Sequence, residues 1–197
     1  MHRLKSWRQA WIGGSAEPCW SGCTAGKASP EPEHHENVQQ SIEDRLLARF
    51  GVKAPIANLA DFAALDPFFR IIEHGLAGLA GPGHFFDLLA EDVTVDYVVT
   101  VPGYPRHIKG RAAVAELYRP YGTMIMLDRC FDLAVHHDAA KGVVVLEYAS
   151  EGHVVGTGRR YANRYISVLT LREGEVAHWR DYLDPVAVFD AVGWPPR

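Results

Sequence analysis

The chain is poor in the features that define several protein classes. It has only three cysteines in 197 residues, an odd count that argues against a disulfide framework. No apolar run approaches the roughly 20 residues needed to span a bilayer, and no basic block or recognition motif accompanies its net charge of −4. These absences exclude membranes and nucleic acids as expected partners and leave a cytoplasmic globular protein as the expectation.

The metal-binding potential of the sequence is equally small. Cys19 and Cys23 lie four residues apart near His34 and His35, but no second cysteine or histidine pair has zinc-site spacing. We therefore expect no metal and no other cofactor.

A change of composition divides the chain. Residues 1–36 are rich in Gly, Ser, Pro and charge, and are predicted to form a disordered or docking tail. Residues 37–61 are predicted to contain an amphipathic helix, Val38 to Phe50, and a connector. Residues 62–197 are predicted to form one domain, and with 48% hydrophobic residues the chain can fill its core.

Within the domain, helices precede strands. Asp66-Pro67 predicts a helix start, with Asp66 as the N-cap, and Arg111 to Tyr118 predicts a second helix. Strands are predicted at Val93 to Val101 and then, separated by turns, at residues 131–137, 143–155, 161–171 and 176–183. The order predicts an α+β fold in which a curved, mainly antiparallel sheet wraps around helices and leaves a cavity.

The end of the chain provides the main chemical lead. In Trp179-Arg180-Asp181-Tyr182-Leu183, strand alternation puts Trp179, Asp181 and Leu183 on one face. A carboxyl group in an apolar cavity has a raised pKa and can exchange protons near neutral pH. Asp181 is therefore the candidate general base or acid, and simple hydrogen bonding that orders the sheet is the alternative.

Four segments of the predicted domain carry informative motifs: Leu89 to Asp96, the loop from Pro102 to Arg111, Gly156 to Tyr161, and Trp179 to Pro185. Together they resemble the SnoaL-like family of the nuclear transport factor 2-like superfamily. The resemblance implies a cone-shaped α+β barrel, commonly a homodimer through the sheet face, that holds a small apolar molecule. The superfamily includes ketosteroid isomerases, polyketide cyclases, limonene-epoxide hydrolases and non-catalytic binding proteins, so fold does not fix function.

Resemblance to these enzymes places further candidates. Against limonene-epoxide hydrolase, Asp181 falls on one catalytic aspartate, Ser150 on the second, Tyr148 on the bridging arginine, and Val95 and Tyr97 on the residues that position water. Against ketosteroid isomerase, Tyr97 takes the position of the base and Ser167 that of the oxyanion-hole aspartate. Neither pattern is complete.

The polyketide cyclases use a histidine with an aspartate, which in this chain makes His153 or His178 a possible partner for Asp181. Tyr161 and Tyr165 share a face and are interpreted as part of the core or of a dimer interface rather than as a cage around a ligand. The predicted catalytic residues are Asp181, Tyr148, Ser150, Tyr97 and His153, and the predicted substrate contacts are Val95, Trp179, Leu183, Ser167 and Tyr165.

The sequence thus predicts a cofactor-free isomerase, cyclase, hydratase or hydrolase for a small, mostly apolar molecule. A non-catalytic binding or accessory dimer of the same fold is the alternative.

Overall fold

The computed structural model describes residues 53, 55–56, 58–99 and 101–194. The predicted tail, the helix at Val38 to Phe50, and Cys19 and Cys23 lie outside these residues, so the domain boundaries stay predictions. Among the described residues, no helix has both the length and the apolar character needed to cross a bilayer, and no group of three or more His, Cys, Asp or Glu side chains is placed to hold a metal ion.

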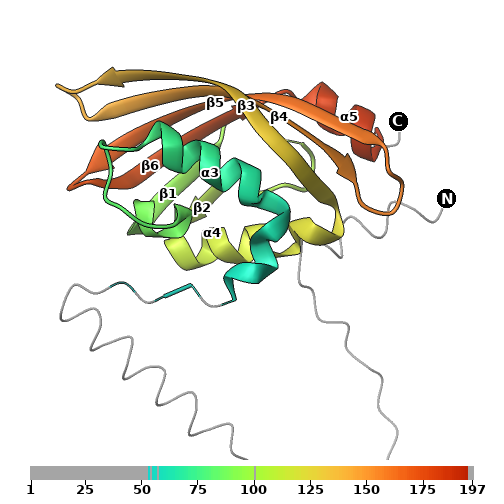
Figure 1. Cartoon of the computed structure of the whole chain (residues 1–197), viewed down its shortest axis with the longest axis horizontal. Coiled ribbons are helices and arrows are strands. Elements are labelled where there is room, and N and C mark those ends of the chain that lie inside the picture. Colours follow the sequence, from blue (N-terminus) through green and yellow to red (C-terminus); the bar gives the residue numbers. More distant parts are fainter. Residues whose placement is uncertain (1–52, 54, 57, 100, 195–197) are drawn as a thin grey trace, which may run out of the picture. The chain divides into compact units, whose positions relative to one another are not determined.

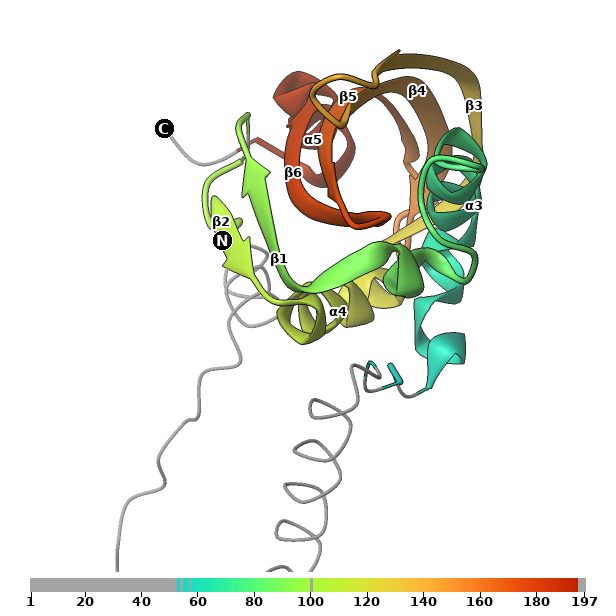
Figure 2. The same cartoon turned by 90° about the vertical axis from the view of Figure 1, so that its left-hand side faces the viewer.

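Six strands form one mixed sheet in the order β2-β1-β6-β5-β4-β3. The strands are β1 (Leu89–Tyr97), β2 (His107–Lys109), β3 (Ile125–Asp138), β4 (Val143–Val154), β5 (Arg160–Arg172) and β6 (Glu175–Leu183). Only β1 and β6 run parallel to each other. The sheet curls strongly without closing, because β2 and β3 remain its two edges (Figures 1 and 2).

The helices occupy the concave side and one end of this sheet. Helix α3 (Asp66–Gly75) packs on β3 and α4 (Arg111–Tyr118) packs on β1, whereas α5 (Pro185–Val192) contacts β4 and β5 (Figure 2). Three short 3-10 helices complete the described elements, η1 (Leu59–Leu65), η2 (Phe85–Leu88) and η3 (Arg119–Thr123). The predicted α+β fold with a curved sheet around helices is confirmed.

Aromatic packing fixes the helices to the sheet at one end of the concave side. The rings of Phe69 and Phe85 stack with centroids 4.4 Å apart, and the Phe62 ring meets the edge of Phe86 at 4.9 Å. All four side chains are 1% exposed. Fully burying one such side chain stabilises a fold by roughly 1.5–3 kcal/mol. This cluster therefore holds the helices against the sheet next to the cavity.

Three local predictions differ from the structure. Asp66 is the first residue of α3 and not its N-cap, and no side chain caps this helix. Strand β1 begins at Leu89 and ends at Tyr97, before the predicted range closes. Strand β3 begins six residues before the predicted Phe131, because Arg129 pairs with Glu151 of β4 and so allows a polar stretch to continue the strand.

Candidate active site

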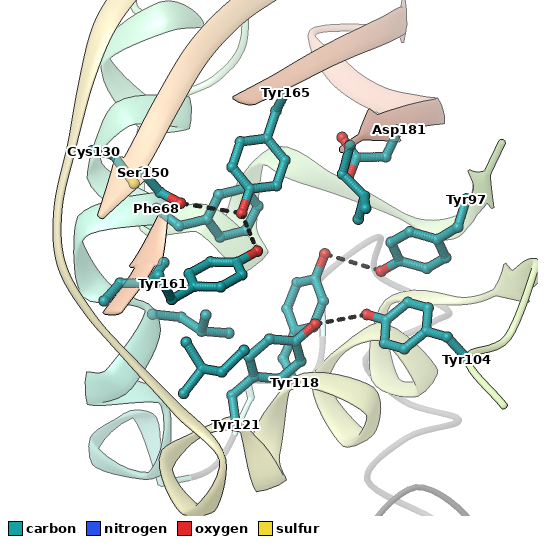
Figure 3. Close-up of a pocket in the computed structure, with 14 residues that line it drawn as sticks. Phe68, Tyr97, Tyr104, Tyr118, Tyr121, Cys130, Ser150, Tyr161, Tyr165 and Asp181 are labelled. Atoms are coloured by element: carbon teal, nitrogen blue, oxygen red, sulfur yellow. Dashed lines mark hydrogen bonds between the residues drawn. The ribbon is translucent and has the colours of Figure 1, made fainter. Parts of the chain in front are cut away.

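A cavity opens on the concave side of the sheet (Figure 3). The space between its atoms, including the mouth, is about 570 Å³. Its wall is mostly aromatic and aliphatic, with a few polar groups, which is the usual character of a small-molecule site. The lining residues are Leu65, Phe68, Tyr97, Tyr104, Tyr118, Tyr121, Ile125, Leu127, Cys130, Ser150, Tyr161, Tyr165, Asp181 and Leu183.

Strand pairing positions Asp181 in this wall. Trp179 and Asp181, two residues apart on β6, are 2% and 8% exposed, because alternate residues of the strand face the concave side. Asp181 is in register with Tyr97 of β1 and with Ser167 of β5. Side chains in register on neighbouring strands lie on the same face, so Asp181 has a tyrosine on one side and a serine on the other.

The Asp181 carboxylate is held by two neutral donors. Ser167 Oγ donates to Asp181 Oδ1 at 2.7 Å, and Trp179 Nε1 donates to the same oxygen at 3.3 Å. Within the described residues, Oδ2 accepts no hydrogen bond. Burial raises the pKa of Asp181 to about 6, against the lowering effect of the two donors. The group therefore exchanges its proton close to neutral pH.

Tyr148 extends this arrangement into the core. Its hydroxyl lies 3.1 Å from Ser167 Oγ. The single hydroxyl hydrogen of Ser167 is used in the bond to Asp181, so Tyr148 must donate to Ser167. The result is a directed chain, Tyr148 to Ser167 to Asp181, in which each donor is polarised by the next acceptor. It stabilises the ionised form of Asp181.

Tyrosine hydroxyls from the sheet and from the helical side point toward the centre of the cavity (Figure 3). Tyr97 of β1 donates to Tyr118 of α4 at 3.1 Å, and the hydroxyl oxygens of Tyr104 and Tyr121 are 3.0 Å apart. Burial raises the pKa of the Tyr118 hydroxyl well above its usual value, so it remains protonated. The pair Tyr97–Tyr118 contains two hydrogens and uses one, which leaves the hydrogen of Tyr118 for a ligand.

The sheet side carries a second hydroxyl network. Tyr165 lies 3.1 Å from Ser150 Oγ and 2.8 Å from the Tyr161 hydroxyl, which accepts from Asn163 at 3.0 Å. The hydroxyls of Ser150, Tyr161 and Tyr165 have three hydrogens and form two hydrogen bonds with one another. One hydroxyl hydrogen therefore remains available to a ligand.

The structure brings five of the ten predicted site residues into the cavity wall. Asp181, Tyr97, Ser150, Leu183 and Tyr165 line the cavity. Tyr161 lines it too, so the interpretation of Tyr161 and Tyr165 as core or interface was incomplete. A further group is buried and does not line the cavity: Tyr148, Ser167, Trp179 and Val95.

His153 lies elsewhere. Its side chain is 44% exposed, and its Nδ1 lies 3.3 Å from Asp128 Oδ1. His178, the other histidine weighed as a partner of Asp181, binds Asp96 on the opposite face of the sheet at 2.7 Å. Neither histidine lines the cavity with Asp181.

The sequence reasoning missed the tyrosines of the helical side. Tyr118 and Tyr121 are three residues apart, the spacing of one helix face, and they flank the Pro120 break. That spacing was the signal that could have found them. Tyr104 lies in the loop between β1 and β2, where no periodicity indicates the direction of a side chain.

The family model described as a SnoaL-like domain matches residues 79–179, which contain β1 to β5 and most of β6. The chain belongs to the SnoaL-like family. The predicted membership is confirmed. Asp181 lies just beyond the matched range, two residues after Trp179.

Individual proteins are also similar to this chain. The uncharacterised Bacillus subtilis protein YesE is 32% identical over 107 residues, which are 54% of this chain and 73% of that protein. A crystal structure from Bacillus subtilis, of a protein with a provisional isomerase name, aligns with a TM-score of 0.53 and 27% identity over 68% of this chain and 94% of the other.

A more distant structure shows the fold alone. A phenazine biosynthesis-related protein from Pseudomonas aeruginosa aligns with a TM-score of 0.51 and 17% identity, over 65% of this chain and 89% of the other.

Proposed function

We propose that this SnoaL-like protein is a cofactor-free acid–base enzyme that acts on a small, mostly apolar molecule in the cavity, with Asp181 as its proton-transfer residue. The observation that carries the proposal is the state of Asp181. Its carboxylate is buried, held through Oδ1 by two neutral donors, and it lines the mostly apolar cavity, while Oδ2 has no protein partner among the described residues.

The chemistry follows from the two kinds of group in the wall. Ionised Asp181 accepts a proton from a bound molecule, and the protonated form returns it, because a pKa of about 6 makes both forms accessible near neutral pH. Negative charge that develops on an oxygen of the ligand is stabilised by the Tyr118 hydroxyl. Tyr118 accepts from Tyr97, which strengthens its own donation.

Proton transfer of this type fits isomerisation and cyclisation. The provisional isomerase name of the Bacillus subtilis relative is in line with the first. The two-aspartate hydrolase pattern lacks support in the cavity, where Ser150 binds Tyr165 and none of the described lining residues is an arginine.

A second function, ligand binding without turnover, is favoured by one observation. Apart from Asp181, the polar groups of the described wall are neutral hydroxyls and the Cys130 thiol, whose pKa burial raises to about 12. Such a wall can hold a molecule without reacting with it. The predicted homodimer through the sheet face stays a prediction under either function.

Solvent deuterium exchange tests the enzymatic proposal. The protein is incubated in D₂O with small cyclic enones and ketones, and deuterium in the recovered compound is measured by mass spectrometry. We expect uptake with at least one compound, an apparent pKa of about 6 in its pH profile, and a loss of about 10²- to 10⁴-fold in Asp181→Asn.

Asp138→Asn is the matched control, because Asp138 is the last residue of β3 and lies outside the cavity wall. Equal uptake in the wild type and in Asp181→Asn would contradict the proposal. Binding of the compounds without uptake would favour the ligand-binding function.

A further inference from the structure

The charges of the cavity wall are unbalanced. Among the described lining residues, Asp181 is the one carboxylate, and no Lys, Arg or His is present. Buried charges in proteins are normally paired with an opposite charge. The two groups that bind Asp181, the Ser167 hydroxyl and the Trp179 indole N–H, are both neutral. The ionised site therefore carries a full negative charge without a counter-charge in its wall.

The hydroxyls of the wall are compatible with a positive ligand. Each tyrosine hydroxyl has two lone pairs and can rotate its hydrogen away from the centre. The hydroxyls of Tyr97, Tyr118, Tyr161 and Tyr165 point toward the space beside Asp181 (Figure 3). Aromatic rings also attract organic cations through their negative faces. An anionic ligand would meet the Asp181 charge with no compensating cation.

We propose that the cavity binds small organic ammonium ions, with an N–H group of the ligand donating to Asp181 Oδ2 and the apolar body of the ligand against the aromatic wall. This inference uses the same cavity as the proposed function but does not depend on turnover. An ammonium ion in this position occupies the base, so we expect it to inhibit proton transfer by Asp181.

The wall favours an organic cation over a metal ion. A metal ion needs several oxygen, nitrogen or sulfur ligands, and among the described residues no group of three His, Cys, Asp or Glu side chains converges. The aliphatic part of the wall, Leu65, Ile125, Leu127 and Leu183, matches a hydrocarbon body.

Three compounds with the same ring and different charges test the inference: cyclohexylammonium, cyclohexanol and cyclohexanecarboxylate. Binding to the full-length protein is measured by calorimetry at pH 8. We expect the ammonium ion to bind at least about tenfold more tightly than the alcohol, since a hydrogen bond to a charged group is strong. The carboxylate should bind most weakly.

The pH dependence gives a second readout. The groups that face Asp181 from the surrounding elements keep their protons in this range, because burial raises the pKa of each hydroxyl. Asp181 itself has a pKa of about 6. Ammonium affinity should therefore fall about tenfold at pH 5, where most of Asp181 is protonated. The hydroxyls that face Asp181 and keep their protons belong to Tyr97 of β1, Tyr118 of α4, Tyr121 of η3, Tyr148 of β4 and Tyr161 of β5.

Asp181→Asn is expected to remove the preference for the ammonium ion over the alcohol and to leave alcohol binding within about threefold. Asp138→Asn should keep the preference. Equal affinity of the ammonium ion and the alcohol in the wild type, or tighter binding of the carboxylate, would overturn the inference.

The two proposals can fail separately. If the wild type shows no preference for the ammonium ion over the alcohol but still exchanges deuterium, the cation site is refuted and the enzyme proposal is left intact. If the ammonium ion binds preferentially but no compound exchanges deuterium, the enzyme proposal is refuted and the cation site is left intact.

Discussion

Asp181 and Asp96 are two aspartates on neighbouring strands that face opposite sides of the sheet. Asp96 of β1 is in register with Arg180, and the next residue, Tyr97, is in register with Asp181. Asp96 lies on the outer face between two imidazoles, His107 and His178, each 2.7 Å away, and these lower its pKa. Asp181 lies on the inner face among neutral donors, and burial raises its pKa.

The comparison shows that hydrogen bonding alone does not decide the pKa of a carboxylate. Both groups accept two side-chain hydrogen bonds. Asp96 has a side chain that is 34% exposed, so its charge keeps much of its hydration and gains two partners that can carry charge. Asp181 loses its hydration and, among the described residues, gains no partner that can carry a positive charge. A shift of one residue along a strand exchanges these environments.

The pH dependence of stability should separate the two aspartates most strongly. The raised pKa of Asp181 means that the folded state holds this proton more tightly than the unfolded chain, so stability falls as pH rises from about 3.8 to about 6 and is then constant. A shift of about two pKa units corresponds to roughly 3 kcal/mol. Asp181→Asn should remove this loss, as measured by urea unfolding at pH 4 to 8.

Asp96→Asn supplies the contrast. The lowered pKa of Asp96 contributes stability above its unfolded pKa, and this contribution is lost as pH falls through the folded pKa. Near neutral pH, the free energy of unfolding of Asp96→Asn should therefore lie below that of the wild type, whereas that of Asp181→Asn should lie above it. A flat difference between the wild type and Asp181→Asn over pH 4 to 7 would show that Asp181 is hydrated in the folded protein.

Removal of the donor behind Asp181 should have the next largest effect. Ser167 is fully buried, and Ser167→Ala deletes one bond to Asp181 and leaves the Tyr148 hydroxyl without its acceptor. We expect the pKa of Asp181 to rise above about 6 and stability at pH 8 to fall by about 1–3 kcal/mol.

Carbon-13 NMR titration of the labelled carboxyl measures this change in pKa. Ser150→Ala is the matched variant, because Ser150 is also buried but binds Tyr165 and not Asp181. If Ser150→Ala moved the pKa of Asp181 as far as Ser167→Ala, the directed chain would not be the cause.

Much of the inner face could be predicted from strand alternation. Trp179 and Asp181 were expected to share a face and do, because β6 has no irregularity between them. The position of a strand residue depends on one repeating geometry, so a short stretch of sequence contains the information.

The other half of the cavity could not be predicted in the same way. Tyr104 lies in a loop, and the direction of its ring depends on the contact with Tyr97, a T-shaped pair with centroids 4.7 Å apart. Strand β2 was missed because three residues carry too little pattern. The His107–Asp96 contact, which ties β2 to β1, was missed with it.

The smallest expected effect concerns the outer face. His178→Gln removes one of the two imidazoles on Asp96. Because this pair is partly exposed, stability should change by no more than about 1 kcal/mol. The pKa of Asp96 should rise toward its usual value, and His107→Gln should act in the same direction. The pKa of Asp181 should stay where it is, since no side chain joins the two carboxylates through the sheet. A shift of Asp181 in either histidine variant, measured in the same carbon-13 titration, would mean that β1 and β6 move as a unit and that the outer face adjusts the acidity of the inner one.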